Sequence, residues 1–255
     1  QDMKRNANML ASYTEQATGI RPTVGKSKNG TAIVLTIDKT IANAEGYKLD
    51  ADAKQIRIAG ASAAGVFYGI QTLRKSLPLV NGKASKVSIP AVHIADAPRF
   101  AYRGTHLDVS RHFVTADSVR QFIDMLALHN INRFHWHLTD DQGWRIEIKK
   151  YPLLTQIGSK RAQTVIGHNS GKYDGKPYSG FYTQKQIRDI VKYAADRYIT
   201  IVPEIDLPGH MQAALAAYPD MGCTGGPYEV WQKWGVSDNV LCAGNDKTLT
   251  FIDNV

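Results

Sequence analysis

From residue 101 to the last residue, the sequence repeats a strand, a polar loop and a helix, and this repeat constrains the fold more than any other feature. Strands are expected at "YRGTHLDV" (102–109), "INRFHWHL" (131–138) and "ITIVPEID" (199–206). Amphipathic helices are expected at 116–130 and 183–198, and another helix begins at "NDKTLTFIDNV" (245–255). Strands that alternate with helices predict βα units on a parallel sheet.

Each expected strand ends in polar, ionisable residues, and in a (β/α)₈ barrel the strand ends form the active-site face. The predicted fold class is therefore α/β, with residues 98–255 forming the N-terminal part of a (β/α)₈ barrel. A whole barrel takes about 250 residues. Three strands cannot close one, because open edges leave backbone groups unpaired. We therefore expect the chain to be a fragment of a longer protein.

Residues 1–97 predict a separate, small α+β domain. "TAIVLTI" (31–37) and "KQIRIAG" (54–60) have the composition of strands, and 62–77 is an amphipathic helix that Ser62 caps and Pro78 follows. "IADAPRF" (94–100) is expected to be a linker.

The charge and hydropathy of the chain limit its partners. The formal net charge is +8, but the lysines of the basic N-terminal part are scattered singly without interleaved aromatic residues, so we expect no nucleic-acid partner. No run of eighteen apolar residues is present, which predicts no membrane span, and the first residues lack the apolar stretch of a signal peptide.

The two cysteines, Cys223 and Cys242, stand outside any CxxC or zinc-binding spacing. Either a loop-closing disulfide or two reduced thiols fits the sequence, because spacing alone does not fix the distance between them.

The segment "FHWHLTDDQGW" (134–144) carries two histidines that point to the same side of a strand. HxH at a barrel strand end can bind a metal, so one alternative is a metal-dependent amidohydrolase that uses His135 and His137 with Asp206 and His210. The other interpretation is a pair of histidines hydrogen-bonded inside the barrel.

Two adjacent aspartates follow these histidines. A loop can direct one carboxylate into a pocket and leave the other for the backbone, although adjacent acids are also common as turn caps. Gln142, Gly143 and Trp144 add hydrogen-bonding groups and an apolar face, the mixture that holds a sugar ring against water.

Three segments in order resemble the β-N-acetylhexosaminidases of glycoside hydrolase family twenty. They are "APRFAYRGTHLDVSRHF" (97–113), "FHWHLTDDQGWRIEIKKYPLLTQIG" (134–158) and "ITIVPEIDLPGH" (199–210). The α+β unit before them is similar to the small domain that precedes the barrel in that family.

The resemblance implies removal of terminal N-acetylglucosamine or N-acetylgalactosamine from glycans, with retention and without a cofactor or metal. The substrate's own acetamido oxygen is the nucleophile in this mechanism. An aspartate orients it, and the next residue, a glutamic acid, protonates the leaving oxygen. No adjacent Asp-Glu occurs in these 255 residues, so the pair lies beyond Val255 or is absent. We expect the chain alone to be inactive, and the whole protein to be periplasmic or secreted.

The resemblance also assigns roles to individual residues. It implies that Arg103 grips hydroxyl groups of the sugar and that Asp140 and His210 contact the general acid, with Asp206 in support. Glu204 and Trp144 are further expected substrate contacts, whereas Trp136 is expected to pack inside the protein. A non-catalytic carbohydrate-binding remnant is the alternative that is not an enzyme.

Overall fold

The structure is a computed structural model that describes residues 1–25, 32–78, 80, 82–84 and 86–255. Thr31, the first residue of one predicted strand, lies outside the described residues. The chain divides into two compact units. The first comprises Gln1–Arg103 with two returning segments, Met125–Asn132 and Asp196–Tyr198, and the second comprises the remaining residues.

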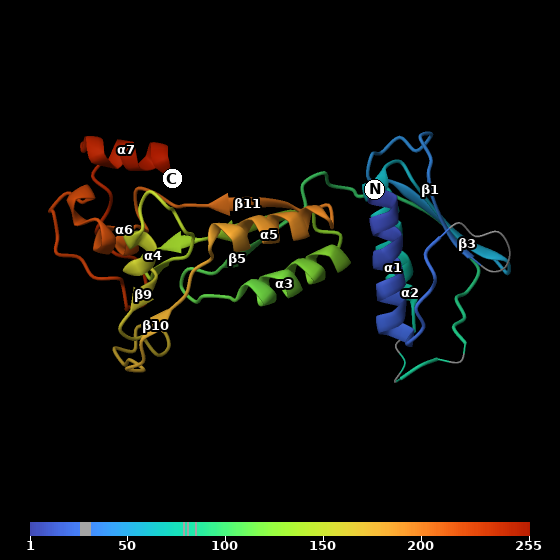
Figure 1. Ribbon diagram of the computed structural model, residues 1–255, viewed down its shortest axis with the longest axis horizontal. Helices are drawn as coiled ribbons and strands as arrows, with labels where there is room; N and C mark the ends of the chain where they lie inside the picture. Colours follow the sequence, from blue (N-terminus) through green and yellow to red (C-terminus); the bar gives the residue numbers. More distant parts are fainter. Residues whose placement is uncertain (26–31, 79, 81, 85) are drawn as a thin grey trace. The chain divides into compact units, whose positions relative to one another are not determined.

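The first unit is a four-stranded sheet covered by helices, as Figure 1 shows. The strands lie in the order β1 (Ala32–Ile37), β3 (Gln55–Gly60), β2 (Tyr47–Ala51) and β4 (Val92–Asp96). β1 and β3 are parallel, and the other neighbouring pairs are antiparallel. Helix α2 (Ala63–Ser76) packs on the sheet, and α1 (Asp2–Thr18) packs on α2.

Helix α2 confirms the amphipathic helix predicted over 62–77. The hydroxyl of Ser62 accepts a hydrogen bond from the backbone N–H of Gly65, which satisfies one of the free donors of the first turn. The apolar side chains spaced along the helix are buried. Gly69 lets the helix approach the sheet, because a Cβ there would lie 2.5 Å from Cγ2 of Ile58.

Three elements of the first unit were not predicted: α1, β2 and β4. The prediction of a linker at 94–100 was wrong for its first half, because Ile94 to Asp96 form the end of β4 and pair with β2. β4 is an edge strand with mostly exposed side chains, so its sequence lacks the apolar and polar alternation that identifies a half-buried strand.

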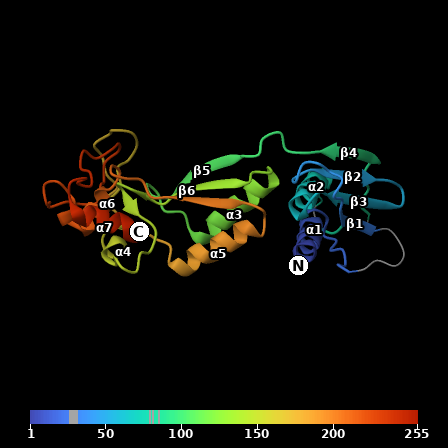
Figure 2. The same cartoon turned by 90° about the horizontal axis from the view of Figure 1, so that it is seen from above.

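The second unit contains the three predicted strands as a parallel sheet in the order β11 (Thr200–Glu204), β6 (Arg133–His137) and β5 (Gly104–Asp108). The predicted helices are confirmed as α3 (Ala116–Leu128), α5 (Gln184–Ala195) and α7 (Asp246–Asn254). Figure 2 shows α3 and α5 along one face of this sheet. This is the α/β arrangement of the first part of a (β/α)₈ barrel.

Strand β6 separates an apolar face from a polar face by simple alternation. Phe134 and Trp136 are buried; the first ring contacts Phe122 of α3, and the second lies 4.8 Å from the ring of Tyr182. The intervening histidines, His135 and His137, point to the opposite face. The core on the helix side therefore fixes which side chains line the interior face of the sheet.

Shorter elements extend the second unit beyond the carboxyl ends of the sheet, as Figure 1 shows. They are β7 (Thr139–Asp140), β8 (Gly143–Trp144), α4 (Leu153–Gln156), β9 (Lys160–Arg161), β10 (Tyr178–Ser179), α6 (Gln212–Ala217) and a 3₁₀ turn (Pro219–Met221). An apolar core that includes Leu154, Leu215 and Phe251 holds part of this region together.

Cys223 and Cys242 are both free thiols, and the sequence alone did not decide between free thiols and a disulfide. Among the described residues, no helix has the length and apolarity needed to cross a bilayer.

Candidate active site

The register of the parallel sheet places three ionisable side chains in a row at the carboxyl ends of the strands. His137 is level with Asp108 of β5 and with Glu204 of β11. Because side chains at matched positions of adjacent strands share a face, these residues come together on the polar side of the sheet. The strand ends are where a (β/α)₈ barrel carries its active site.

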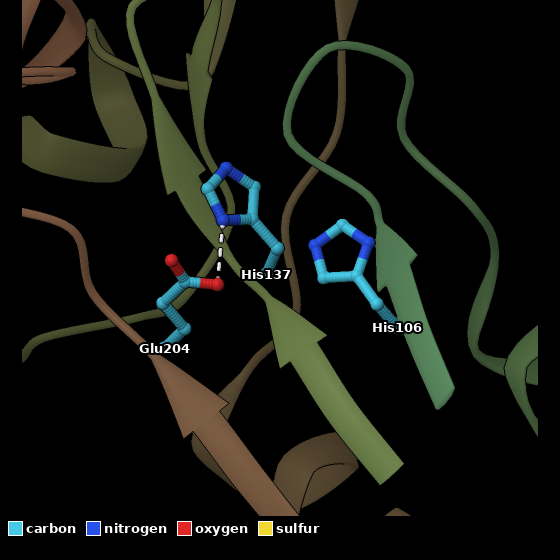
Figure 3. Close-up of side chains that lie close together, drawn as sticks. All are labelled: His106, His137 and Glu204. Carbon is cyan, nitrogen blue, oxygen red and sulfur yellow. Dashed lines mark hydrogen bonds and ion pairs between the residues drawn. The ribbon is translucent and has the colours of Figure 1, made fainter. Parts of the chain in front are cut away.

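His137 connects two carboxylates, as Figure 3 shows for one of them. Its Nδ1 donates to Glu204 at 2.8 Å, and its Nε2 donates to Asp140 at 2.9 Å. The Nε2 atom of His135 contacts the same oxygen of Glu204. A continuous hydrogen-bonded chain therefore runs from β11 through β6 to the loop that follows it.

Among the residues linked by these hydrogen bonds, Asp140 is the most enclosed, with 1% of its surface exposed. One oxygen accepts from His137 and pairs with Nη2 of Arg111 at 2.8 Å; the other accepts from the backbone N–H of Asp141 and from Nδ1 of His210 at 3.1 Å. Burial alone would raise the pKa of Asp140, but these donors and positive charges hold it below its usual value. Asp140 is thus an ionised carboxylate in a nearly closed site.

The pKa of His137 is shifted upward, whereas that of Asp140 is shifted downward. Burial disfavours the charged form of His137, but the hydrogen bonds to Asp140 and Glu204 outweigh burial and raise its pKa to about 9. The pKa of Glu204 is held below its usual value, against the effect of burial, by His137 and His135. Near neutral pH the cluster therefore contains an imidazolium between two carboxylates.

The neighbouring Asp141 serves the backbone instead. Its two oxygens accept from the N–H groups of Gln212 and Ser237, at 3.1 and 2.9 Å. The two aspartates therefore differ, because Asp140 contacts the side chains of His137, Arg111 and His210, whereas Asp141 accepts from these two backbone groups. Burial is the main cause that raises the pKa of Asp141, and the charge of Asp140 adds to it.

His210 and Asp206 lie on the loop after β11. His210 has a φ of 55°, a left-handed conformation that costs free energy in a residue other than glycine and is common at functional sites. That conformation accompanies the contact of its Nδ1 with Asp140. Asp206 lies farther away: a carboxylate oxygen is 3.9 Å from Nε2 of His210, and its backbone N–H donates to Thr139.

Among the residues that the structure describes, two groups of side chains have the spacing of metal ligands: His106 with His137 and Glu204, shown in Figure 3, and Asp140 with Asp141 and His210. In each group the ligand atoms lie within 4.8 Å of one another. However, both nitrogens of His137 donate to carboxylates, and the oxygens of Asp140 already accept from four donors. A metal would have to displace these protons, so the arrangement fits an acid/base network better than a metal centre.

Arg103, which was expected to grip a sugar, makes its contacts within the first unit. Its guanidinium pairs with Glu45 at 2.8 Å and donates to the hydroxyl of Tyr68 and to the backbone oxygens of Phe100 and Asn130. Arg103 directly precedes β5 and so lies at the amino end of that strand. The sugar contact of Arg103 stays a prediction.

Trp144 is a core residue with 1% of its surface exposed. Its indole N–H donates to the backbone oxygen of Ile146, and its ring packs against Phe251. A ring enclosed in this way has no free face for a sugar, so the substrate contact expected of Trp144 has no support in the structure. Trp136 is buried as predicted.

One member of the cluster, Arg111, was not singled out in the sequence. It pairs with Asp108 and with Asp140, both at 2.8 Å. The available signal was its position three residues after Asp108, where the chain leaves β5 at the polar edge of the sheet.

Comparison with known proteins assigns the chain to a family. "Glycosyl hydrolase family 20, catalytic domain" matches residues 100–255, and "Glycosyl hydrolase family 20, domain 2" matches residues 1–97. The chain belongs to glycoside hydrolase family 20. Its relatives in this family include a β-hexosaminidase of Porphyromonas gingivalis, which is 44% identical over the whole chain. The chain spans 33% of that relative's length.

Solved structures of family 20 enzymes have the same fold. A β-N-acetylhexosaminidase from Streptomyces coelicolor A3(2) matches all of this chain with a TM-score of 0.88 and 37% identity. A mutant Streptomyces plicatus β-hexosaminidase in complex with its product, GlcNAc, matches equally well. The chain covers 50% and 49% of these two proteins, respectively.

Proposed function

We propose that this chain provides the small domain and the first strands of the catalytic barrel of a β-N-acetylhexosaminidase. The whole protein would remove terminal, non-reducing N-acetylglucosamine or N-acetylgalactosamine from glycans, with the substrate's acetamido group as nucleophile and retention of configuration. The related structure with bound GlcNAc supports this substrate class.

The observation that carries the proposal is the buried, ionised Asp140 between His137, Arg111 and His210 at the carboxyl end of the sheet. A fixed carboxylate disfavours a second negative charge nearby and so keeps a neighbouring carboxylic acid protonated at working pH. In the proposed reaction, Asp140 and His210 position such an acid and tune its pKa.

The rest of the network keeps Asp140 in place. His137 is held by Glu204 and donates to Asp140, so the imidazole cannot rotate without breaking a charge-assisted hydrogen bond at each end. Arg111 supplies the second positive charge. These residues are positioning residues, whereas the groups that attack and protonate the glycosidic bond are the acetamido oxygen and the acid.

The test is hydrolysis of an aryl N-acetylglucosaminide by a protein in which this chain is joined to the remaining barrel strands. Turnover is expected, and the anomeric configuration of the first product, followed by NMR, should be retained. Asp140→Asn should lower kcat/KM by about 10² to 10⁴, the range of general acid/base assistance. Absence of turnover in a folded protein would favour a carbohydrate-binding role.

The same protein distinguishes the metal-dependent alternative. Activity should survive exhaustive EDTA, because the proposed mechanism uses no Lewis acid. Loss of activity that zinc restores would point to the histidine cluster as a metal centre.

A periplasmic or secreted location is also part of the proposal. Fractionation of cells that produce the whole protein tests this location.

A further inference from the structure

A pocket of about 550 Å³ lies beside the Asp140 cluster, within the second unit. Arg111 belongs to both, because it lines the pocket and pairs with Asp140 at 2.8 Å. The loop that carries Lys233 and Trp234 also lines the pocket. Gln142 connects Arg111 to this loop: its amide oxygen accepts from Arg111, and its amide nitrogen donates to the backbone oxygen of Gly235 at 2.9 Å.

The lining of this pocket is rich in positive charge. Three cationic side chains, Arg111, Arg161 and Lys233, line it together with one carboxylate, Asp108. His112 also lines the pocket, and burial together with the charges of Arg161 and Arg145 lowers the pKa of His112. The environment therefore disfavours a further positive charge.

Two arginines in this region are buried without an acidic partner. Arg161 is 5% exposed and donates to Thr164 and to the backbone oxygen of Gln142. Arg145, which is fully buried and, like Arg161, lies near the ring of Tyr178, donates to the backbone oxygens of Ser110, Ser159 and Gly180. Within the described part of the chain, neither guanidinium forms an ion pair with a carboxylate. A buried cation without a counter-ion is unfavourable, and a bound anion would relieve this.

The pocket also offers an aromatic surface. Trp234 is 52% exposed, although it lines a cavity, and the ring of His168 contacts it edge-on at 4.1 Å. An accessible indole face packs well against the apolar face of a sugar ring, and the cations around it suit an anionic substituent.

We propose that this pocket binds an acidic sugar, with the ring on Trp234 and a sulfate or carboxylate group on Arg161 and Lys233. The inference deepens the proposed function, on which it rests, by naming glycans that carry an acidic residue next to the cleaved N-acetylhexosamine as the substrate class. Sulfate esters and uronic acids share the required chemistry, an oxyanion on a sugar.

The experiment uses the 255-residue chain and tryptophan fluorescence, and it needs no turnover. Galactose 6-sulfate, glucuronate, galactose and inorganic sulfate are titrated in turn. At least one acidic sugar should bind about tenfold more tightly than galactose, the ratio that corresponds to about 1.4 kcal/mol, close to one charge-assisted hydrogen bond. Which acidic sugar responds identifies the source of the oxyanion. Trp234→Phe should remove the signal.

Variants of Lys233 test the charge without touching the core, because Lys233 is exposed. Lys233→Gln should reduce the preference for the acidic sugar to threefold or less, Lys233→Arg should keep it, and Lys149→Gln, which removes an exposed lysine outside the pocket, should leave it unchanged. Equal binding of acidic and neutral sugars, or inorganic sulfate binding as tightly as galactose 6-sulfate, would overturn the proposal. Hydrolysis of a neutral substrate is measured separately, so failure of either proposal can be recognised on its own.

Discussion

The imidazole of His137 donates to the buried carboxylate of Asp140 across 2.9 Å, while its other nitrogen donates to Glu204. Both partners are anionic, so the histidine keeps its proton well above the pH at which a free imidazole loses it. The pKa of His137 therefore reports whether its hydrogen bonds to Asp140 and Glu204 are formed. It can be measured in this chain without any catalytic turnover.

Asp140→Asn should lower the pKa of His137 from about 9 toward the ordinary value, because one of its two anionic partners becomes neutral. The variant should also lose about 2 to 3 kcal/mol of stability, since charge-assisted hydrogen bonds are lost. NMR titration of the histidine ring nitrogens measures the pKa directly. Asp206→Asn is the matched control, because Asp206 contacts His210 and not His137. An unchanged His137 titration in Asp140→Asn would remove Asp140 from the network.

The stability of the second unit should fall as the pH rises from 6.5 through 9. His137 has a folded-state pKa of about 9 and an ordinary value of 6.5, so its contribution is complete below 6.5 and is lost as the pH passes 9. Asp140 and Glu204 have lowered pKa values, so their contributions are present above their ordinary values and are lost on acidification.

Urea denaturation across this pH range measures the effect. The difference in unfolding free energy between the parent chain and His137→Gln should shrink between pH 6.5 and 9. A difference that stays constant with pH would mean that the proton on His137 does not stabilise the fold.

The sequence predicted the parallel strands and the polar strand ends at which Asp140, His210 and Glu204 lie, because alternation on β6 and polar strand ends are local signals. The substrate contact expected of Glu204 stays a prediction. The sequence did not reveal Arg111, whose role depends on a side chain reaching from the loop after β5 to the loop after β6. The enclosure of Trp144 was not apparent in the sequence for a similar reason: only packing against Phe251 of α7, far along the chain, shows that its ring is enclosed. Edge strand β4 was missed because four of its five residues are exposed and none is fully buried.

Trp144→Ala should destabilise the chain by about 3 to 5 kcal/mol, the usual cost of removing a fully buried large aromatic side chain. Trp144→Phe should cost less, because it retains much of the contact with Phe251. Denaturant unfolding measures both changes. In the whole protein, Trp144→Phe should leave the KM for an aryl N-acetylglucosaminide within about twofold, once folding is verified. A large rise in KM without loss of stability would restore Trp144 as a sugar contact.

The last prediction separates a structural role of Arg103 from a substrate role. Its guanidinium pairs with Glu45 at 2.8 Å, and Tyr68 contacts both side chains. Burial would raise the pKa of Glu45, but Arg103 and Asn132 lower it, so the stabilisation is present above the ordinary pKa of Glu45 and is lost as the pH falls. A double-mutant cycle of Arg103→Gln and Glu45→Gln should therefore give a coupling free energy of about 1 kcal/mol at pH 7, modest because both side chains are partly exposed.

That coupling should shrink as the pH falls below the ordinary pKa of Glu45 and disappear once Glu45 is protonated. In the whole protein, a purely structural Arg103 predicts that both single variants change kcat/KM alike, through stability alone. The resemblance instead predicts a strong loss for Arg103→Gln and near-normal kinetics for Glu45→Gln, because only the arginine would touch the sugar. Measuring the cycle and the kinetics on the same variants decides between the two roles, because only the substrate role predicts that the two single variants differ in kcat/KM.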